Sequence, residues 1–272
     1  MTARARTTAR TLRIDDVPAA FDSAAGTYDR MVNLNPGYHR HLQSAADALV
    51  EKLPAGRGLV VVDLGCGSGA STDALVNSMG HRGQRFSALG VDGSSGMLEE
   101  ARSKSWPTWV SFRQARVEDL SELADTLTSS GAEGNGSGAG SNGSSEGAGG
   151  VAGILAAYLF RNVDDRDAVL RSVYDLLTPG GVLVAQDYSV AGSHSARWVW
   201  TAVSWSLVIP LSKVINSDAG LYRYLWRSVL DNDTVDQFAG RMLAAGFTEV
   251  ETRTVAGWQN GILHTYRGRK PE

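Results

Sequence analysis

The sequence predicts an α/β protein with a doubly wound, mostly parallel sheet of seven strands, helices at its N-terminus and a helical, aromatic-rich cap. Five short apolar segments alternate with segments of helical character, a pattern typical of parallel strands joined by right-handed crossovers. The 272 residues are enough to bury a sizeable core within one large domain.

Two helices are expected before the first strand. Apolar residues from Val17 to Met31 follow the spacing of an amphipathic helix. After a turn at residues 35–37, a second helix is expected from Tyr38 to Leu53, where Pro54 and Gly56 end it.

Three strands and two helices follow. The first strand is expected at Gly58–Leu64, a continuous apolar run of the kind found in strands buried on both faces. The second is expected at Phe86–Val91 and the third at Trp109–Gln114. Helices are expected between them, at Ala70–Met79 and Gly96–Lys104.

The next part of the chain continues this alternation. A fourth strand is expected at Val151–Tyr158 and a fifth at Val182–Asp187. A helix over Asp165–Leu177 and a turn at Thr178–Gly181 separate them. The whole order predicts a Rossmann-like sheet.

Two segments interrupt the alternation. Residues 129–150 are almost wholly Gly, Ser, Ala and Asn, and we expect a flexible insertion because such a segment buries too little apolar area to offset its ordering entropy. Residues 191–230 concentrate Trp and Tyr among aliphatic residues and predict a helical cap. A helix at Thr234–Ala245 and two antiparallel strands, Thr248–Val255 and Gly261–Tyr266, are expected to complete a mixed sheet.

Composition and charge limit the partners and the compartment. The net charge of -3 provides no basic field for nucleic acid, so a small-molecule acceptor is expected. Cys66 has no second cysteine to pair with, which favours a reducing cytoplasm. The apolar run Trp198–Leu211 is too short to span a bilayer, so we expect a cytoplasmic protein, with peripheral contact at the inner face of the membrane as a further option. Residues 1–14 are expected to be a disordered basic tail, and no metal site is expected.

A glycine-rich turn follows the first strand. Gly65, Gly67 and Gly69 are spaced by two, which lets the backbone turn tightly and approach a ligand, and Ser68 adds a hydroxyl. A tight strand-to-helix turn without any ligand explains the same glycines.

An acidic residue ends the second strand. Asp92 stands 23 residues after Gly69, close to the spacing of roughly 20 at which a carboxylate accepts hydrogen bonds from ribose hydroxyls. A solvated or helix-capping Asp is the alternative. Together the turn and the acid favour a nucleoside ligand.

The spacing of the glycines bears on which nucleoside binds. A dinucleotide site has G-x-G-x-x-G, with the pyrophosphate at the helix N-terminus. Here the spacing is G-x-G-x-G, and Asp63 precedes it with a charge that repels a pyrophosphate and suits the ammonium of a methionine. This favours S-adenosylmethionine over NAD, and an NAD-dependent oxidoreductase stays as an alternative of a different class.

Several longer motifs then occur in order along the chain. They are F-x-x-x-A-x-x-Y-D at 21–29, His39-Arg40, VDLGCGSG at 62–69, VDGSSGML at 91–98, R-N-V at 161–163, LTPGGVLV at 177–184 and Y-x-Y-L at 222–225. With these motifs the chain resembles class I methyltransferases, and within them the ubiquinone/menaquinone-biosynthesis C-methyltransferase (UbiE-like) family. The first, the R-N-V and the Y-x-Y-L motifs are the narrower ones.

This resemblance implies a methyltransferase domain over residues 15–272 with S-adenosylmethionine as cofactor. The implied cofactor-binding residues are Asp63, Gly65, Gly67, Ser68, Gly69, Asp92, Met97, Arg116, Val117, Glu118 and Ala157. Arg116 and Val117 occupy the loop expected at the adenine. Arg116 departs from the family pattern, which has Asp or Asn there, so Glu118 is an alternative adenine contact.

The resemblance also implies the reaction, which is C-methylation of a prenylated quinol precursor such as demethylmenaquinol. Methylation of oxygen or nitrogen on another lipophilic aromatic metabolite, and a binding module that has lost turnover, are alternatives. By resemblance Arg161 is expected beside the phenolate, and a salt bridge to Asp164 or Asp165 is its alternative role. Residues expected near the substrate are Tyr28, His39, Asn162 and Tyr222, with helix packing as the alternative for His39.

Overall fold

The computed structural model describes residues 37–54, 58–80, 86–120, 150–214 and 219–272, with scattered positions between residues 19 and 35. The predicted basic tail and residues 129–149 of the predicted insertion lie outside the described residues. In the first predicted helix, Ala19, Phe21, Gly26 and Asp29 are among the described positions, and all of them are helical.

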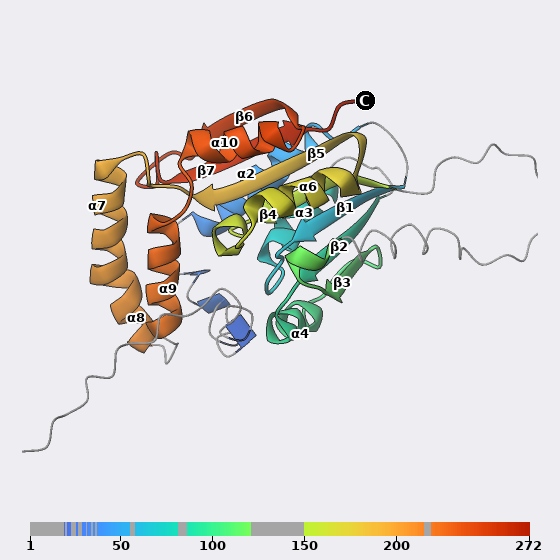
Figure 1. Ribbon diagram of the computed structural model, residues 1–272. Helices are drawn as coiled ribbons and strands as arrows, with labels where there is room; N and C mark the ends of the chain where they lie inside the picture. The colour runs from blue at the N-terminus through green and yellow to red at the C-terminus, as the bar shows by residue number, and fades with distance from the viewer. Residues whose placement is uncertain are drawn as a thin grey trace, which may run out of the picture.

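The sheet has seven strands in the order β3-β2-β1-β4-β5-β7-β6, which confirms the predicted fold (Figure 1). The first five strands run parallel, whereas β7 lies antiparallel to both of its neighbours. The strands are β1 (Leu59–Leu64), β2 (Phe86–Asp92), β3 (Val110–Gln114), β4 (Val151–Ala157), β5 (Leu177–Tyr188), β6 (Thr248–Thr254) and β7 (Leu263–Arg269).

Helices cover both faces of this sheet because successive strand residues point to opposite sides. Val61 of β1 belongs to one buried cluster, together with Leu49 and Leu75, whereas Val62 belongs to another, together with Leu170 and Met242. The first cluster includes α2 (Tyr38–Val50) and α3 (Ala70–Gly80), and the second includes α6 (Arg166–Leu176) and α10 (Val235–Ala244). Helix α4 (Ser95–Ser103) packs against β2 and β3.

Strand β5 differs from the prediction at its start. The expected turn at Thr178–Gly181 lies inside β5, between Leu177, which pairs with Val151, and Val182, which pairs with Gly153. The residues between these pairs bulge out of the ladder. The strand continues through them because the chain after β7 supplies partners, with Lys270 N donating to the Gly181 carbonyl at 2.8 Å.

The predicted cap is helical, as expected. It consists of α7 (His194–Val203), a π-helical segment η4 (Ser204–Val208), α8 (Ile209–Val214) and α9 (Ala219–Leu230). Pro210 has no amide hydrogen to donate, which weakens the α-helical ladder where η4 passes into α8. The cap stands beside the carboxyl end of β5 (Figure 1), so it lies at the sheet edge where ligands of this fold bind.

Candidate active site

The glycine turn after β1 has the geometry that its sequence predicts. Gly65 has a φ of 74° and Gly67 a φ of 53°, both in the left-handed region that glycine adopts without strain. Apart from its chain neighbours, none of the described residues has an atom within 4 Å of where a Cβ on Gly67 would stand, so the turn is open at this point. The Gly67 amide donates to Asp92 Oδ2 at 2.8 Å, which joins the two predicted parts of the site.

Asp92 lies at the end of β2 with acceptor capacity to spare. Its Oδ1 accepts from Ser94 N at 2.8 Å, and its Oδ2 accepts from Gly67 N. A carboxylate has about four lone-pair sites, so Asp92 keeps acceptor capacity for a ribose hydroxyl. Burial raises the pKa of Asp92, and hydrogen bonds from the backbone amides of Ser94, Gly67 and Gly93 oppose that rise.

Asp63 lies behind the turn rather than in the cavity. Its Oδ2 accepts from Ser71 Oγ at 2.8 Å and Thr72 Oγ1 at 2.6 Å, which fastens the start of α3 to β1. Its Oδ1 is buried and has no partner among the described residues. Burial raises the pKa of Asp63 to about 6, and the nearby Asp92 charge adds to that rise.

One cavity brings most of the predicted cofactor residues together. Nine of the eleven line it, Asp63 and Gly69 being the two that do not. The nine are Gly65, Gly67, Ser68, Asp92, Met97, Arg116, Val117, Glu118 and Ala157. Arg116 Nε lies 3.3 Å from Glu118 Oε2, an exposed pair in the loop where the resemblance implies the adenine contact. We call this space the cofactor cavity.

This cavity fits the expected adenosyl cofactor. Asp92 offers free acceptor sites to a ribose, and Met97 and Val117 offer apolar surface to a base. Gly65 and Gly67, both with positive φ, add backbone that a ligand can approach closely.

Two carboxylates from the N-terminal segment tie that segment to the rim of the cavity. Asp22 Oδ1 accepts from Ser94 Oγ at 2.5 Å and from Gly96 N at 2.8 Å. Asp29 accepts from Ser68 Oγ and, at 2.8 Å, from Lys104 Nζ. Sequence reasoning missed both carboxylates as site residues, although each lies in the F-x-x-x-A-x-x-Y-D motif. Tyr28, which was expected near the substrate, lies outside the described residues.

A second cavity, here called the cap cavity, lies against the inner side of the cap. Most of its lining is apolar, and the polar side chains in it include Asn35, Arg161 and Gln259. The apolar and aromatic residues lining it include Val203, Leu207, Val208, Leu211, Tyr222, Leu225, Trp226 and Val229. Tyr38, Tyr158 and Arg161 line both cavities, so the two spaces meet there.

The predicted substrate residues divide between these spaces. Tyr222 lines the cap cavity, and Asn162 lines the cofactor cavity. His39 lines neither, because it is exposed on α2, where its Nε2 lies 2.5 Å from Asn33 Oδ1. His39 therefore lies on the exposed surface of α2, away from both cavities.

Tyr158 stands at the junction of the cavities in an unusual conformation. Its φ is 59°, which is uncommon for a residue with a side chain and occurs mainly where function or packing requires it. Its ring stacks on Tyr38 at a centroid distance of 5.5 Å and on Tyr188 at 5.2 Å. Sequence reasoning missed Tyr158, because nothing in an apolar strand end indicates this backbone turn.

Arg161 follows Tyr158 in the short helical turn η3 (Phe160–Asn162). Its Nη1 lies 2.5 Å from Asp187 Oδ1, and its backbone N donates to Asp187 Oδ2 at 3.0 Å. The alternative prediction for Arg161, a salt bridge to Asp164 or Asp165, is therefore wrong, because its acidic partner is Asp187. Asp165 caps α6 instead, accepting from Ala168 N, whereas Asp187 is brought close by the pairing of β4 with β5.

The guanidinium of Arg161 also lies over aromatic rings. Its Cζ is 5.4 Å from the ring centroid of Tyr158 and 5.7 Å from that of Tyr188. Both distances are within the range of a cation–π contact. The ion pair and the rings together fix the guanidinium at the junction of the two cavities, beside the carboxylate that balances its charge.

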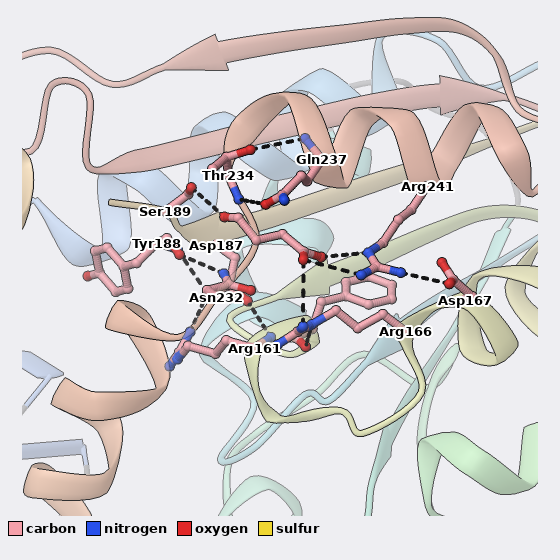
Figure 2. Close-up of polar contacts among 12 residues, drawn as sticks. Arg161, Arg166, Asp167, Asp187, Tyr188, Ser189, Asn232, Thr234, Gln237 and Arg241 are labelled. Atoms are coloured by element: carbon pink, nitrogen blue, oxygen red, sulfur yellow. Dashed lines mark hydrogen bonds and ion pairs between the residues drawn. The ribbon is translucent and has the colours of Figure 1, made fainter. Parts of the chain in front are cut away.

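A polar network connects this junction to the chain that leaves the cap (Figure 2). Asn232 Nδ2 donates to the Tyr188 carbonyl at 2.7 Å, and Arg166 Nε donates to the Phe160 carbonyl at 2.9 Å. Arg241 forms two salt bridges, one with Asp233 at 2.8 Å and one with Asp167 at 2.7 Å. The network fixes the end of the cap relative to the turn that carries Arg161.

The described part of the chain has neither a metal-binding cluster nor a membrane-spanning helix. No group of three or more His, Cys, Asp or Glu side chains there is arranged to hold a metal ion. None of the helices described has the length and apolar character needed to cross a bilayer.

Comparisons with known proteins agree with this site. Residues 38–232 match the family described as Methyltransferase domain. The ubiquinone/menaquinone biosynthesis C-methyltransferase UbiE of Pectobacterium carotovorum subsp. carotovorum (strain PC1) is 29% identical over 273 residues, 97% of this chain and 94% of that protein.

Solved structures show the same fold at lower sequence identity. A chain of the complex between the Haloferax volcanii Trm112 methyltransferase activator and the putative methyltransferase has a TM-score of 0.57 at 18% identity, covering 93% of this chain and 98% of that one. A SAM-dependent methyltransferase of Thermotoga maritima, described as a possible histamine N-methyltransferase, has a TM-score of 0.53 at 18% identity, covering 93% and 99%.

Proposed function

The chain belongs to the Methyltransferase domain family, and we propose that it methylates a ring carbon of a lipophilic aromatic acceptor, a prenylated quinol precursor such as demethylmenaquinol. The enzyme class and the cofactor, S-adenosylmethionine, follow from the family match and the similar proteins. The UbiE relatives, which are named as C-methyltransferases of quinone biosynthesis, support the choice of acceptor.

The NAD-dependent alternative is not retained. The family that matches this chain is a methyltransferase family, and the matched residues include the glycine turn and Asp92. The sheet also departs from the dinucleotide-binding order 3-2-1-4-5-6, because an antiparallel β7 stands between β5 and β6.

The main support for this proposal is that the cofactor cavity and the cap cavity adjoin at Tyr158 and Arg161. Methyl transfer needs donor and acceptor aligned within a few ångströms, and two adjoining binding spaces supply that alignment. The cofactor cavity is lined by Asp92, which would bind the ribose in this proposal, and by Met97 and Val117, which would contact the base. The cap cavity supplies the apolar walls that a prenyl tail requires.

The polar groups of the cap cavity lie where the head of such an acceptor would bind. Tyr158 and Tyr188 line this cavity as part of a stacked aromatic cluster, and Tyr188 Oη accepts from Asn35 Nδ2 and Gln259 Nε2, each at 3.4 Å. Aliphatic side chains of η4, α8 and α9 line the rest of the cavity. The proposal therefore places the ring near Arg161 and the tail along the cap.

Arg161 has the charge that this chemistry needs. A ring carbon becomes nucleophilic when the phenol beside it loses its proton, and a fixed guanidinium stabilises the phenolate that results. Bound S-adenosylmethionine supplies an electrophilic methyl group. After the phenolic proton has left to water, Arg161 would hold the phenolate oxygen while the carbon–carbon bond forms and the sulfur–methyl bond breaks. The hydrogen on the methylated ring carbon would then leave as a proton and the oxygen would be reprotonated, which restores the aromatic ring.

Mass spectrometry of the product tests the acceptor. The purified chain is incubated with methyl-labelled S-adenosylmethionine and demethylmenaquinol, and fragmentation locates the label. We expect the label on a ring carbon. A label on oxygen or nitrogen, or label transferred only to other lipophilic aromatics, would replace the proposed acceptor. Cofactor binding with no transfer to any aromatic would favour a module that has lost turnover.

A further inference from the structure

Large apolar side chains are exposed on one part of the cap. Among the described residues, Trp198, Trp205, Leu207 and Val214 are 74%, 47%, 57% and 78% exposed, and all four lie in the continuous segment α7–η4–α8. Such a concentration on a protein surface indicates a surface that is covered in use. We call these four residues the cap face.

The cap face adjoins the entrance of the cap cavity. Leu207 is both exposed and part of the cavity lining. Trp258, in the connection between β6 and β7, is 41% exposed and lines the same cavity. The cavity therefore opens between apolar side chains that are themselves exposed, which is the arrangement a lipophilic molecule needs to enter without crossing water.

The charge of the cap differs from that of the whole chain. Residues 191–230 contain Arg197, Lys213, Arg223 and Arg227 against one acid, Asp218, a balance of +3 in a chain of net charge -3. The four basic residues are all exposed. Arg227 pairs with Asp231 at 2.7 Å, and even with that acid counted the balance stays positive, at +2.

We propose that the cap face docks on an anionic lipid bilayer and delivers the acceptor from the bilayer to the cap cavity. Tryptophan side chains favour the boundary between lipid tails and headgroups, and exposed Lys and Arg are attracted to anionic headgroups. A second copy of the chain is a poorer partner, since a symmetric dimer through this face brings two positive caps together. The inference rests on the proposed lipophilic acceptor.

Vesicle binding by the full chain tests this docking. Flotation is measured with vesicles of phosphatidylcholine alone and of phosphatidylcholine mixed with phosphatidylglycerol, without cofactor or acceptor. We expect binding to the anionic vesicles that falls as salt rises, because added salt screens the charge attraction. A Trp198→Ser/Val214→Ser variant leaves the lining of the cap cavity intact. Its affinity for the anionic vesicles is expected to be at least about tenfold lower than that of the wild type.

Leu243→Ser is the matched control. Leu243 is 58% exposed on α10, away from the cap segment, so this variant is expected to bind vesicles as the wild type does. Equal binding by the wild type and the double variant, or no binding to anionic vesicles, would overturn the proposal. So would a concentration-dependent dimer that the double variant abolishes while vesicles bind neither protein, because the cap face would then be an interface between copies.

The same variants separate docking from the proposed reaction. On a short-tailed acceptor in detergent-free buffer, the double variant is expected to methylate at the wild-type rate. On an acceptor embedded in anionic vesicles, its rate is expected to fall with its vesicle binding. Docking without methylation of any quinol would leave the docking inference standing and refute the proposed acceptor.

Discussion

Arg161 and Asp187 form a buried ion pair at the junction of the two cavities. Arg161 Nη1 lies 2.5 Å from Asp187 Oδ1, and each side chain is about 6% exposed. The same carboxylate accepts from the Arg161 backbone amide, so it fixes the turn and the guanidinium together. The position of the charge at the active site therefore depends on an acid that lies on the neighbouring strand.

Removal of Arg161 is expected to abolish most of the methyl transfer and to spare cofactor binding. Arg161→Gln should lower kcat by about 100-fold or more, since a positioned group that assists proton loss contributes about 10²–10⁴-fold. The affinity for S-adenosylmethionine should change by less than about threefold, because Asp92 and the glycine turn are untouched. Kinetics with the labelled cofactor and calorimetric titration measure the two quantities.

Variants of Arg161 and Asp187 are expected to be less stable than the wild type, because each leaves one buried charge unpaired. Arg161→Gln and Asp187→Asn each leave one buried charge without its partner, which costs about 3–5 kcal/mol of unfolding free energy. The double variant removes both charges and should recover part of that loss without recovering activity. Urea denaturation of the four proteins measures the coupling, and additive losses would show that the pair does not act as a unit.

Asp92→Ala is expected to weaken binding of S-adenosylmethionine. A charged acceptor of ribose hydroxyls contributes ~1.5–3 kcal/mol, or roughly 10- to 150-fold in Kd. Glu99→Ala, an exposed acid on α4, is the control and should bind as the wild type does. Calorimetric titration gives both values, and wild-type affinity in Asp92→Ala would remove this carboxylate from the site.

Much of this site is predictable because it is local in sequence. The glycine turn and Asp92 each follow a buried strand, and neighbouring parallel strands bring their carboxyl ends to one edge of the sheet. The hydrogen bond from Gly67 to Asp92 is a consequence of that arrangement. The strand–helix order is predictable for the same reason, because periodicity within about ten residues determines it.

The missed features are those that depend on distant parts of the chain. Arg161 pairs with Asp187 because β4 and β5 are neighbours, and spacing in the sequence favoured the nearer Asp164 and Asp165 instead. Asp22 and Asp29 reach the rim from a segment about 70 residues away from α4, which no local pattern indicates. The cap cavity likewise exists only once the cap is packed beside the sheet.

The buried carboxyl of Asp63 makes stability depend on pH. Its pKa is about 6 in the folded chain against 3.8 for the ordinary side chain, so the folded state retains the proton over that interval. Its contribution is most favourable below pH 3.8 and is lost as the pH rises through about 6. Asp63→Asn has no such titration, and its stability relative to the wild type should rise by about 3 kcal/mol over this interval. Urea denaturation between pH 4 and pH 7 measures the difference, and a constant difference would contradict the assignment.

Asp29 is expected to hold the N-terminal segment over the bound cofactor. It accepts hydrogen bonds from Ser68 and Lys104, and Lys104 Nζ also donates to the Ser68 carbonyl at 2.7 Å, so the three residues form one cluster at the rim. Asp29→Ala should speed cofactor dissociation by about tenfold, the effect of losing one or two hydrogen bonds of about 1 kcal/mol each. Stopped-flow release of S-adenosylhomocysteine measures the rate. Arg30→Ala, on the next residue and exposed, should leave it unchanged.

Filling the cap cavity should distinguish acceptors by the length of their tails. Leu211 lines this cavity and is absent from the cofactor cavity, so Leu211→Trp adds bulk along the proposed path of the tail. The variant should raise KM for a long-tailed quinol by about tenfold, since each buried methylene group contributes about 0.8 kcal/mol and a bulky ring displaces several. KM for S-adenosylmethionine and kcat for a tail-less quinol should stay within about twofold. Leu211→Met keeps the volume and is the control. If long and short acceptors suffer equally, the tail binds outside the cap cavity, and the ring approaches Arg161 from another direction.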